Sequence, residues 1–351
     1  MRSRTVLCSA SALSALALLS GCGNSESLPT VDAPLVGVDY PRSDTDFWRS
    51  FIQYTPRYSG QLGLTLKTTN SHNDASRLAS DAQALMDQGV KGIVIAPQDT
   101  AAITPTLKQL AAKKIPVVSV DTRPDKGKVY MVVRADNHAY GEAACRYLGA
   151  ELNGAGKVVM LEGDLFSVNG RDRTEAFNAC MKKNYPDIEV FGEATSWDGN
   201  VAARKLRADL TAHPDIKGIY MQSSFALSGT IQTLKDKGML VGRESSSHVF
   251  VVSNDGIPAE LRYIASGKID ATVSQPADLY ARYAIYYLNA ALKGKKFRTG
   301  KTDHDSTIVQ VRPGLLEDQL PAPLVTADGG TYGGMHSTKY NDASLWGNNL
   351  G

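Results

Sequence analysis

Polar side chains follow four apolar segments of the sequence, at the points where buried strands would end. Residues 117–120 lead into Asp121, 131–133 into Asp136 and Asn137, 249–253 into Asp255, and 271–274 into Gln275. Ligands of open α/β sheets bind beyond the carboxyl ends of the strands, so these are positions where ligand contacts are expected. Taken singly, each fits a helix cap or a turn better. Because all four positions follow apolar segments in the same way, together they favour a site that recognises its ligand through carboxylate and amide groups.

Catalytic chemistry has little support in the sequence. The six histidines show neither an HExxH motif nor paired metal-ligand spacing, and there is no GxSxG nucleophile motif. Gly154 and Gly156 precede a predicted strand, whereas the glycine motif of a nucleotide site follows one. The sequence therefore predicts a protein that is not an enzyme and that carries no cofactor and no bound metal.

Short apolar strands alternate with amphipathic helices through most of the chain. One series begins with a strand at 35–39, and a second starts after a strand at 129–133, with a helix at 140–152. This alternation indicates two similar α/β halves, each with a parallel sheet covered by helices on both faces. Two consecutive halves would not need the later helix at 277–292 and the strand at 306–311. These additional elements suggest that the chain crosses between the halves more than once.

The C-terminal segment differs from the rest of the chain in amino-acid composition. From Arg312 onward Pro, Gly, Asn and Tyr dominate and no periodicity is sustained. We expect residues 313–351 to be a surface-wrapping or disordered extension, although Tyr332 and Trp346 suggest that part of it packs against the body.

The composition fits an exported globular protein better than a nucleic-acid-binding one. The chain has 351 residues, more than one hydrophobic core usually holds, so two domains are expected. Without Arg2 and Arg4, 36 basic residues balance 36 acidic residues. This balance leaves no electrostatic footprint for DNA or RNA, and no nucleic-acid partner is predicted.

The N-terminal segment predicts export. A short positive segment is followed by an apolar segment at 6–19, which is too short to span a bilayer comfortably. The run Leu19-Ser20-Gly21-Cys22 then resembles the bacterial lipobox, in which the cysteine receives a lipid and becomes the first mature residue. An ordinary signal peptide that happens to contain a cysteine is the alternative. We predict lipidation at Cys22 and attachment to the outer face of the cell membrane, or a place in the periplasm.

Two cysteines remain after Cys8 is removed with the signal and Cys22 is assigned to lipid. They are Cys145 and Cys180. Because exported proteins meet an oxidising environment, this pair is predicted to form a disulfide.

Six motifs together make the sequence resemble the periplasmic sugar-binding family of ABC importers, which includes the ribose- and galactose-binding proteins. The motifs are Val120-Asp121, Ala135-Asp136-Asn137, residues 170–177, Thr211-Ala212-His213-Pro214-Asp215, Asn254-Asp255-Gly256 and residues 271–275. The match runs from about residue 35 to residue 311 and is specific through the order and spacing of the motifs. We therefore treat the family pattern as a guide to fold and site.

The resemblance implies two Rossmann-like α/β lobes with parallel sheets flanked by helices, joined by a three-crossing hinge as in a type I periplasmic binding protein. It places the crossings near 134–136, 274–276 and 301–305. The expected division is a signal peptide at 1–21, a tether at 22–34, an N-terminal lobe of 35–134 plus 276–302, a C-terminal lobe of 135–275 plus 303–312, and an extension at 313–351. Asp303-His304-Asp305 looks metal-like, but its place at the third crossing favours a polar hinge.

The family pattern also implies roles for individual residues. It places Asp121 and Asp255 on sugar hydroxyls as acceptors, Arg173 as a forked donor, and Asn137 and Gln275 as amides that both donate and accept. Asp136 belongs to the same motif as Asn137. Nearby Arg171 is expected at the surface.

Aromatic side chains are expected to pack on the C–H face of the ligand. Phe47 and Trp48 stand where the family has paired phenylalanines, and Trp197 stands where it has an aromatic after a strand. Asp44 is expected to add a further acceptor. Core packing is an equally good interpretation of Phe47 and Trp48 taken alone.

One departure from the family pattern bears on ligand size. Where the family usually has an Asn-Asp pair after a glutamine, this chain has Gln222-Ser223-Ser224. Ser223 and Ser224 are shorter, so we expect a four- or five-carbon polyol or a pentose in place of a hexose.

The prediction from sequence is a lipid-anchored solute receptor that presents a small carbohydrate or sugar alcohol to an ABC permease. We expect it to be a monomer that meets the membrane through its lipid anchor only. A receptor that signals to a membrane sensor or chemoreceptor uses the same lobe surfaces and stays open as an alternative. A secreted enzyme on the same scaffold lacks motifs to support it.

Overall fold

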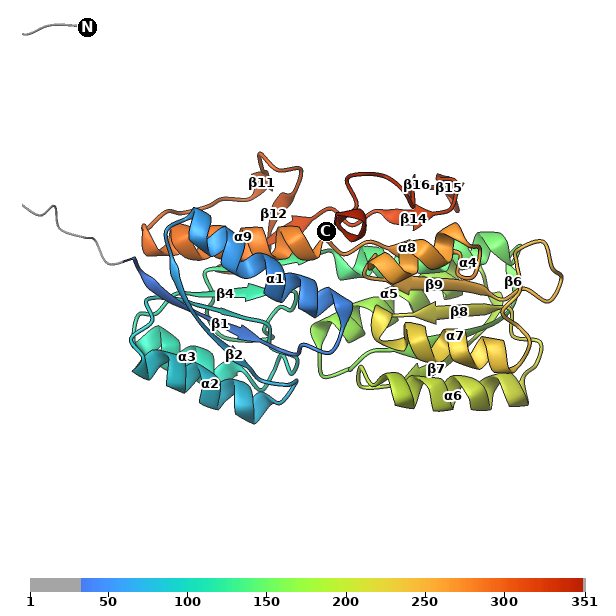
Figure 1. Cartoon of the computed structure of the whole chain (residues 1–351), viewed down its shortest axis with the longest axis horizontal. Helices are drawn as coiled ribbons and strands as arrows, with labels where there is room; N and C mark the ends of the chain where they lie inside the picture. The colour runs from blue at the N-terminus through green and yellow to red at the C-terminus, as the bar shows by residue number, and fades with distance from the viewer. Residues whose placement is uncertain (1–32, 350–351) are drawn as a thin grey trace, which may run out of the picture. The chain divides into compact units, whose positions relative to one another are not determined.

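Two eight-stranded sheets organise the protein, and helices flank each of them (Figure 1). The computed structural model describes residues 33–349. The predicted signal peptide, most of the predicted tether and Cys22 lie outside these residues. Within the described part of the chain, no helix combines the length and the hydropathy needed to cross a bilayer.

The first lobe is built around a parallel sheet that begins at Leu35. Its parallel strands in chain order are β1 (Leu35–Tyr40), β2 (Thr65–Asn70), β3 (Ile93–Ile95), β4 (Val117–Val120) and β5 (Met131–Ala135), with helices α1 (Asp46–Gln61), α2 (Ala75–Asp87), α3 (Thr104–Ala112) and α9 (Ala277–Leu292). Strands β3, β4 and β5 are buried along their whole length, as expected for strands covered on both faces. Side-chain caps start α1 and α2; in α2, the Asp74 carboxylate accepts a hydrogen bond from Arg77 N at 2.8 Å.

The second lobe repeats this plan. Its parallel strands are β6 (Ala155–Glu162), β7 (Asp187–Ala194), β8 (Gly218–Met221), β9 (Phe250–Asn254) and β10 (Ala271–Val273). Its helices are α4 (Asn137–Glu151), α5 (Val168–Asn184), α6 (Gly199–Ala212), α7 (Leu227–Asp236) and α8 (Pro258–Ala265), with a short 3₁₀ turn η1 (Ser224–Ala226) before α7. The predicted fold class, two α/β lobes with mostly parallel sheets flanked by helices, is confirmed.

The third crossing lies later in the chain than expected. Strands β11 (Gly300–Lys301), β12 (Thr307–Arg312) and β13 (Leu315–Leu320) all belong to the first sheet, where β13 pairs in parallel with β5. The assignment of 303–312 to the second lobe was therefore wrong, and the chain crosses at Pro321-Ala322-Pro323 instead of 301–305.

Buried charge explains why this segment stays with the first lobe. The carboxylate of Asp318 on β13 is fully buried and accepts hydrogen bonds from Tyr287 OH at 3.0 Å and from Ser306 Oγ. His304 Nε2 lies 3.0 Å from the same carboxylate, and the His304 ring stacks on Tyr283. Asp303-His304-Asp305 is thus neither a hinge nor a metal site, and no group of three potential metal ligands occurs among residues 33–349.

The C-terminal segment is folded, so the disordered form of the expected extension is wrong, whereas the expectation that Trp346 packs against the body is confirmed. Strand β14 (Leu324–Thr326) pairs with β10, and β15 (Gly330–Tyr332) and β16 (Met335–Lys339) extend the second sheet beyond it. A 3₁₀ turn η2 (Trp346–Asn348) follows, with Trp346 buried. These strands are only three to five residues long, too short for an alternating apolar pattern to be recognised in the sequence.

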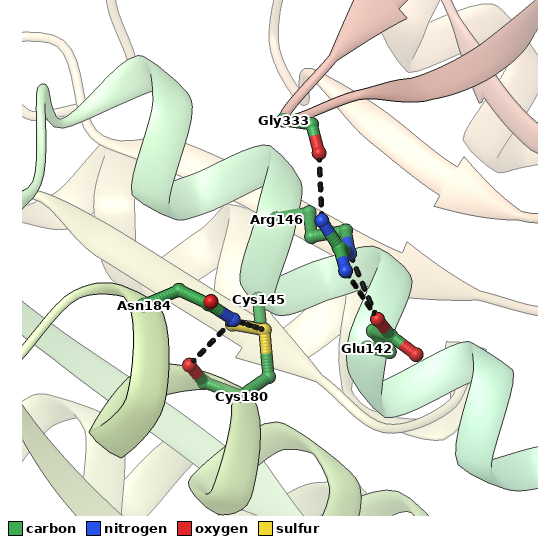
Figure 2. Close-up of a disulfide and its surroundings, with 6 residues drawn as sticks. All are labelled: Glu142, Cys145, Arg146, Cys180, Asn184 and Gly333. Carbon is green, nitrogen blue, oxygen red and sulfur yellow. Dashed lines mark hydrogen bonds and ion pairs between the residues drawn. A yellow bond between two sulfur atoms is a disulfide. The ribbon is translucent and has the colours of Figure 1, made fainter.

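A disulfide joins α4 to α5 in the second lobe. Cys145 and Cys180 form this bond, as the sequence predicted, and both sulfur-bearing side chains are buried (Figure 2). On the opposite side of α4, Arg146 donates to the carbonyl of Gly333 at 2.9 Å and pairs with Glu142 (Figure 2). The same helix therefore holds both α5 and the turn between β15 and β16.

We expect the double variant Cys145→Ala/Cys180→Ala to lose stability. The bond closes a loop with a sequence separation of 35 residues, for which the loss of unfolded-state restriction costs about 3–4 kcal/mol of the free energy of unfolding. Urea unfolding of the parent and the variant measures the difference. Dithiothreitol should lower the melting temperature of the parent and leave that of the variant unchanged, and a parent indifferent to reductant would contradict the prediction.

Candidate ligand-binding site

A cavity between the two lobes is lined by the carboxyl-terminal ends of strands from both sheets. The first lobe contributes Arg42, Thr45, Phe47, Trp48, Gln98 and Asp121, the second lobe contributes Asn169, Arg173, Trp197, Ser223, Phe225 and Asp255, and Gln275 comes from the second crossing. The enclosed volume is about 40 Å³. Polar and aromatic side chains from both lobes thus face one small space.

Each lobe positions one aspartate of the site, and the backbone conformation and hydrogen bonding at the two aspartates are alike. Asp121 follows β4 and donates its N–H to Val133 O at 2.9 Å, and Asp255 follows β9 and donates its N–H to Val273 O at 2.9 Å. Both have positive φ, 64° for Asp121 and 116° for Asp255. Residues other than glycine rarely adopt this region, and such strain gathers at functional sites.

Arg173 of α5 is the central cation of the site. Its side chain is 2% exposed. Its Nε donates to Asn137 Oδ1 at 2.6 Å, a terminal nitrogen donates to Gln275 Oε1 at 2.8 Å, and the other donates to the carbonyl of Gln222. The guanidinium also lies over the ring of Tyr140. Because a guanidinium has five N–H groups, two remain after these three bonds to serve a ligand.

Two serines hold the carboxylate of Asp255. Ser223 Oγ, Ser224 Oγ and Ser224 N all donate to its Oδ2, at 2.7, 2.6 and 2.9 Å. Its Oδ1 accepts no hydrogen bond from residues 33–349 and is free to accept from a ligand. The serines that depart from the family pattern therefore act chiefly by positioning this carboxylate, and Ser223 also lines the cavity.

Aromatic rings form two walls of the cavity. Phe47 and Trp48 open α1, where Thr45 Oγ1 accepts a hydrogen bond from Trp48 N at 3.3 Å. On the other side Trp197 lies against Gly163, where a β-carbon would sit only 2.0 Å from the indole ring. The indole Nε1 of Trp197 is buried and has no partner within the described part of the chain. Such an unpaired buried donor is uncommon in folded proteins.

Burial changes the acidity of both carboxyl groups. Desolvation raises the pKa of Asp121 to about 6, although the positive charges of Arg173 and Arg134 oppose the shift. Desolvation also raises the pKa of Asp255, against the charge of Arg173 and the hydrogen bonds from Ser224 and Ser223. Ligand hydroxyls that donate to these carboxylates favour their ionised forms.

Three residues expected at the cavity do not line it. Asp44 is exposed and pairs with Arg42 at 2.7 Å. Asp136 caps α4, where its carboxylate accepts from His138 N and Ala139 N. Asn137 lies behind the cavity, where it supports Arg173. In each case a nearer donor holds the polar side chain away from the ligand space.

Arg171 lies at the surface, as expected, with its side chain about one-third exposed. Its guanidinium also reaches across to the first lobe, 2.7 Å from Asp125 Oδ1 and 3.1 Å from Thr100 Oγ1. The carbonyl of Phe166 accepts from both Arg171 and Thr100. These contacts join the lobes at the rim of the cavity.

Sequence reasoning missed several residues of the cavity wall. They are Arg42, Thr45, Gln98, Asn169 and Phe225. Gln98 follows the buried strand β3, so the rule that found Asp121 also applies to it. Asn169 is the second residue of α5, and the others occupy loops or short turns without a distinct local pattern.

A family model described as a periplasmic binding protein domain matches residues 36–296. The chain belongs to this family. The resemblance seen in the sequence motifs is therefore confirmed. The prediction that the protein is not an enzyme is also confirmed, because its relatives are substrate-binding proteins.

Individual relatives of this periplasmic binding protein cover most of its length. The ribose import binding protein of Bacillus subtilis is 25% identical over 261 residues, which are 74% of this chain and 82% of that protein. The xylitol-binding protein of Mycolicibacterium smegmatis is 25% identical over 309 residues, 87% of this chain and 84% of that protein. Among solved structures, an ABC transporter solute-binding protein from Mycobacterium smegmatis with bound glycerol has a TM-score of 0.69 and 26% identity, covering 76% of this chain and 90% of that one.

We expect Arg173→Ala to weaken ligand binding by tenfold or more. The substitution leaves buried acceptors unpaired and removes the cation between two carboxylates, at a cost of about 2–4 kcal/mol. Arg171→Ala is the matched control: its pair with Asp125 is about one-third exposed, so its loss should weaken binding by about fivefold at most. Calorimetry with the tightest of ribose, xylitol and erythritol measures both. Parent-like affinity of the Arg173 variant would disprove its place in the site.

Ligand affinity should fall as the pH drops through about 6. A ligand whose hydroxyls donate to Asp121 favours the carboxylate, so its binding lowers a pKa that burial has raised to about 6 in the free protein. Affinity is then full above pH 6 and decreases below it, by up to tenfold per pH unit. Asp121→Asn cannot ionise and should give a flatter profile. Equal pH dependence of parent and variant would assign the effect to another group.

Proposed function

We propose that the protein is the extracytoplasmic receptor of an ABC importer and captures a four- or five-carbon polyol or a pentose between its lobes. The observation that carries this proposal is the convergence of Asp121, Arg173 and Asp255 in one buried cavity. All three line the cavity, where the carboxylates supply acceptors and the guanidinium supplies donors, and a ligand rich in hydroxyls needs both kinds of partner. The aromatic walls supply an apolar surface for its C–H groups.

The size of the cavity supports a small ligand. The space open to water-sized groups is about 40 Å³, so a tetritol requires less separation of the lobes than a hexose does. Ser223 and Ser224 hold Asp255 in place without projecting a long side chain into this space. Relatives that bind xylitol, or that hold glycerol in the crystal, have ligands of comparable chemistry.

Transport by such a receptor depends on closure of the lobes. Contacts across the cavity, such as Arg171 with Asp125 and Arg42 with the carbonyl of Trp197 at 3.2 Å, exist only when the lobes meet. A ligand that bonds to Asp121 of one lobe and Asp255 of the other stabilises the same state. A permease that recognises the closed form then receives loaded receptors.

A thermal-shift screen tests the ligand class directly. We expect erythritol, xylitol, arabitol or ribose to raise the melting temperature in a concentration-dependent way, because a ligand that binds only the native state stabilises it. Galactose and glucose serve as the hexose comparison. Stabilisation by hexoses alone would refute the size argument, and no shift with any sugar or polyol would refute carbohydrate capture.

We also propose that Cys22 carries the lipid that holds the receptor at the membrane. Support comes from the lipobox-like run Leu19-Ser20-Gly21-Cys22 after an apolar segment. Cys22→Ser should release the protein from the membrane fraction or block its processing. Unchanged retention, together with an unmodified parent by mass spectrometry, would contradict lipidation.

A further inference from the structure

The end of the first lobe that lies away from the second lobe carries a concentration of basic side chains. Its helices run antiparallel to its strands, so helix C-termini and strand N-termini meet at one edge of the sheet. Strand β1 begins at this edge, at the left of the view in Figure 1. Lys91 N donates to Leu35 O there at 2.7 Å, which places the turn before β3 beside the start of β1.

We name this surface the basic edge and define it by eight exposed residues: Lys91, Lys113, Lys114, Lys128, Lys293, Lys295, Lys296 and Arg298. Backbone contacts bring their turns together. Tyr130 N donates to Val117 O, and Tyr130 OH donates to Lys295 O at 2.6 Å. In the described turns 87–92, 112–116, 126–130 and 292–298, Asp87 is the only acidic residue. The edge is therefore strongly positive.

The corresponding end of the second lobe has no such excess. Its exposed lysines, Lys182, Lys183, Lys235 and Lys268, alternate with exposed acids, Asp187, Glu189, Asp215 and Glu244. Because basic and acidic residues balance over the chain from Cys22 onward, the charge at the basic edge reflects an uneven distribution and not an overall positive charge. An uneven distribution orients a protein near a charged surface.

Apolar surface accompanies the charge. Lys114 and Lys128 border a groove of about 330 Å³ whose other lining residues include Ile115, Pro116 and Val129. Leu62, at the end of α1, is one of three large apolar side chains exposed within residues 33–349. Lysines around apolar surface match the bilayer interface, where ammonium groups meet headgroups and apolar atoms lie just below.

The chain also enters the body at this edge. Cys22 precedes Ala33 by eleven residues, so a lipid on Cys22 lies at most about 40 Å along the chain from Ala33. The proposed anchor therefore brings the basic edge within reach of the bilayer, where charges attract over Debye lengths of about 8 Å at physiological salt. We propose that the basic edge binds the anionic lipid headgroups of the membrane. This contact adds to the proposed lipid anchor, on which its role in the cell rests, whereas the sequence had led us to expect the anchor alone.

Vesicle binding of the unlipidated chain tests the proposal separately from the anchor. The protein is the chain from Gly23 onward, which includes the whole compact unit Ala33–Gly351. We expect it to sediment with vesicles of phosphatidylglycerol and phosphatidylcholine but not with phosphatidylcholine alone, and the bound fraction should fall as salt increases. The triple variant Lys114→Glu/Lys128→Glu/Lys295→Glu should bind the anionic vesicles at least tenfold more weakly, because each basic residue near such a surface contributes to binding.

A matched variant separates position from net charge. Lys182→Glu/Lys183→Glu/Lys268→Glu makes the same charge change on the second lobe and should retain anionic vesicle binding within about twofold. Equal loss in both triple variants, or equal parent binding to neutral and anionic vesicles, would overturn the proposal. If a Glu variant unfolds, the corresponding Lys→Gln triple variants of both sets are compared instead. The Gln variant of the basic edge should then bind anionic vesicles at least threefold more weakly than the Gln variant of the second lobe. Calorimetry measures sugar binding, and lipidation of Cys22 is measured separately. A negative result with vesicles would therefore leave the proposed function unaffected.

Discussion

The buried guanidinium of Arg173 is the interaction on which the binding site depends. A buried cation is costly unless hydrogen-bond acceptors and opposite charges surround it. Three oxygens of the second lobe and the second crossing supply the acceptors, while Asp255 and Asp121 supply negative charge. Because Asp121 belongs to the other lobe, the charge is balanced from both sides only when the lobes meet. Ligand recognition and closure therefore draw on the same few charges.

A second buried ionic cluster lies at the hinge. Arg134, 1% exposed, donates to Asp172 Oδ2 at 3.0 Å and lies 3.8 Å from Glu317 Oε2. It also donates to Asn169 Oδ1 at 2.8 Å, and Asn169 lines the cavity. Separating a buried pair leaves an uncompensated charge, which is strongly unfavourable. Since Arg134 directly precedes the first crossing, the cluster fixes the pivot about which the lobes move and connects it to the ligand space.

The sequence predicted the elements with strong local signals and missed those that depend on distant partners. Helix α9 was predicted with the bounds that the structure shows, because a long amphipathic pattern is visible locally. Strand β13 was missed because Glu317 and Asp318 interrupt its apolar pattern. Burial of these two carboxylates depends on Arg123, which bonds to Glu317, and on His304, which lies beside Asp318. Arg123 is distant in the sequence, and no local pattern marks His304 as a partner. The same limit applies to Arg171, whose partner Asp125 lies 46 positions earlier.

Within the site, strand ends were the useful signal. Asp121, Asp255 and Gln275 follow apolar runs, and all three line the cavity. Asp136 satisfies the same rule but caps a helix, since the sequence cannot show which way a side chain turns. Local pattern therefore locates the region of the site, whereas the hydrogen-bond partners decide which residues face the ligand.

The last turn of the chain has a practical consequence for anyone who labels this protein. Trp346 Nε1 donates to Asp255 O at 2.9 Å, and its ring packs edge-on against Phe47. Trp346 therefore contacts one cavity-lining residue from each lobe. Gly347 lies so close to Gly256 O that a β-carbon would come within 2.2 Å of it. A fluorophore joined after Asn349 begins three residues beyond Trp346, whereas one joined before Ala33 begins next to the start of β1 (Figure 1). The C-terminus is thus the better place for a fluorescent reporter of ligand binding, and the N-terminus is the better place for a purification handle that leaves binding undisturbed.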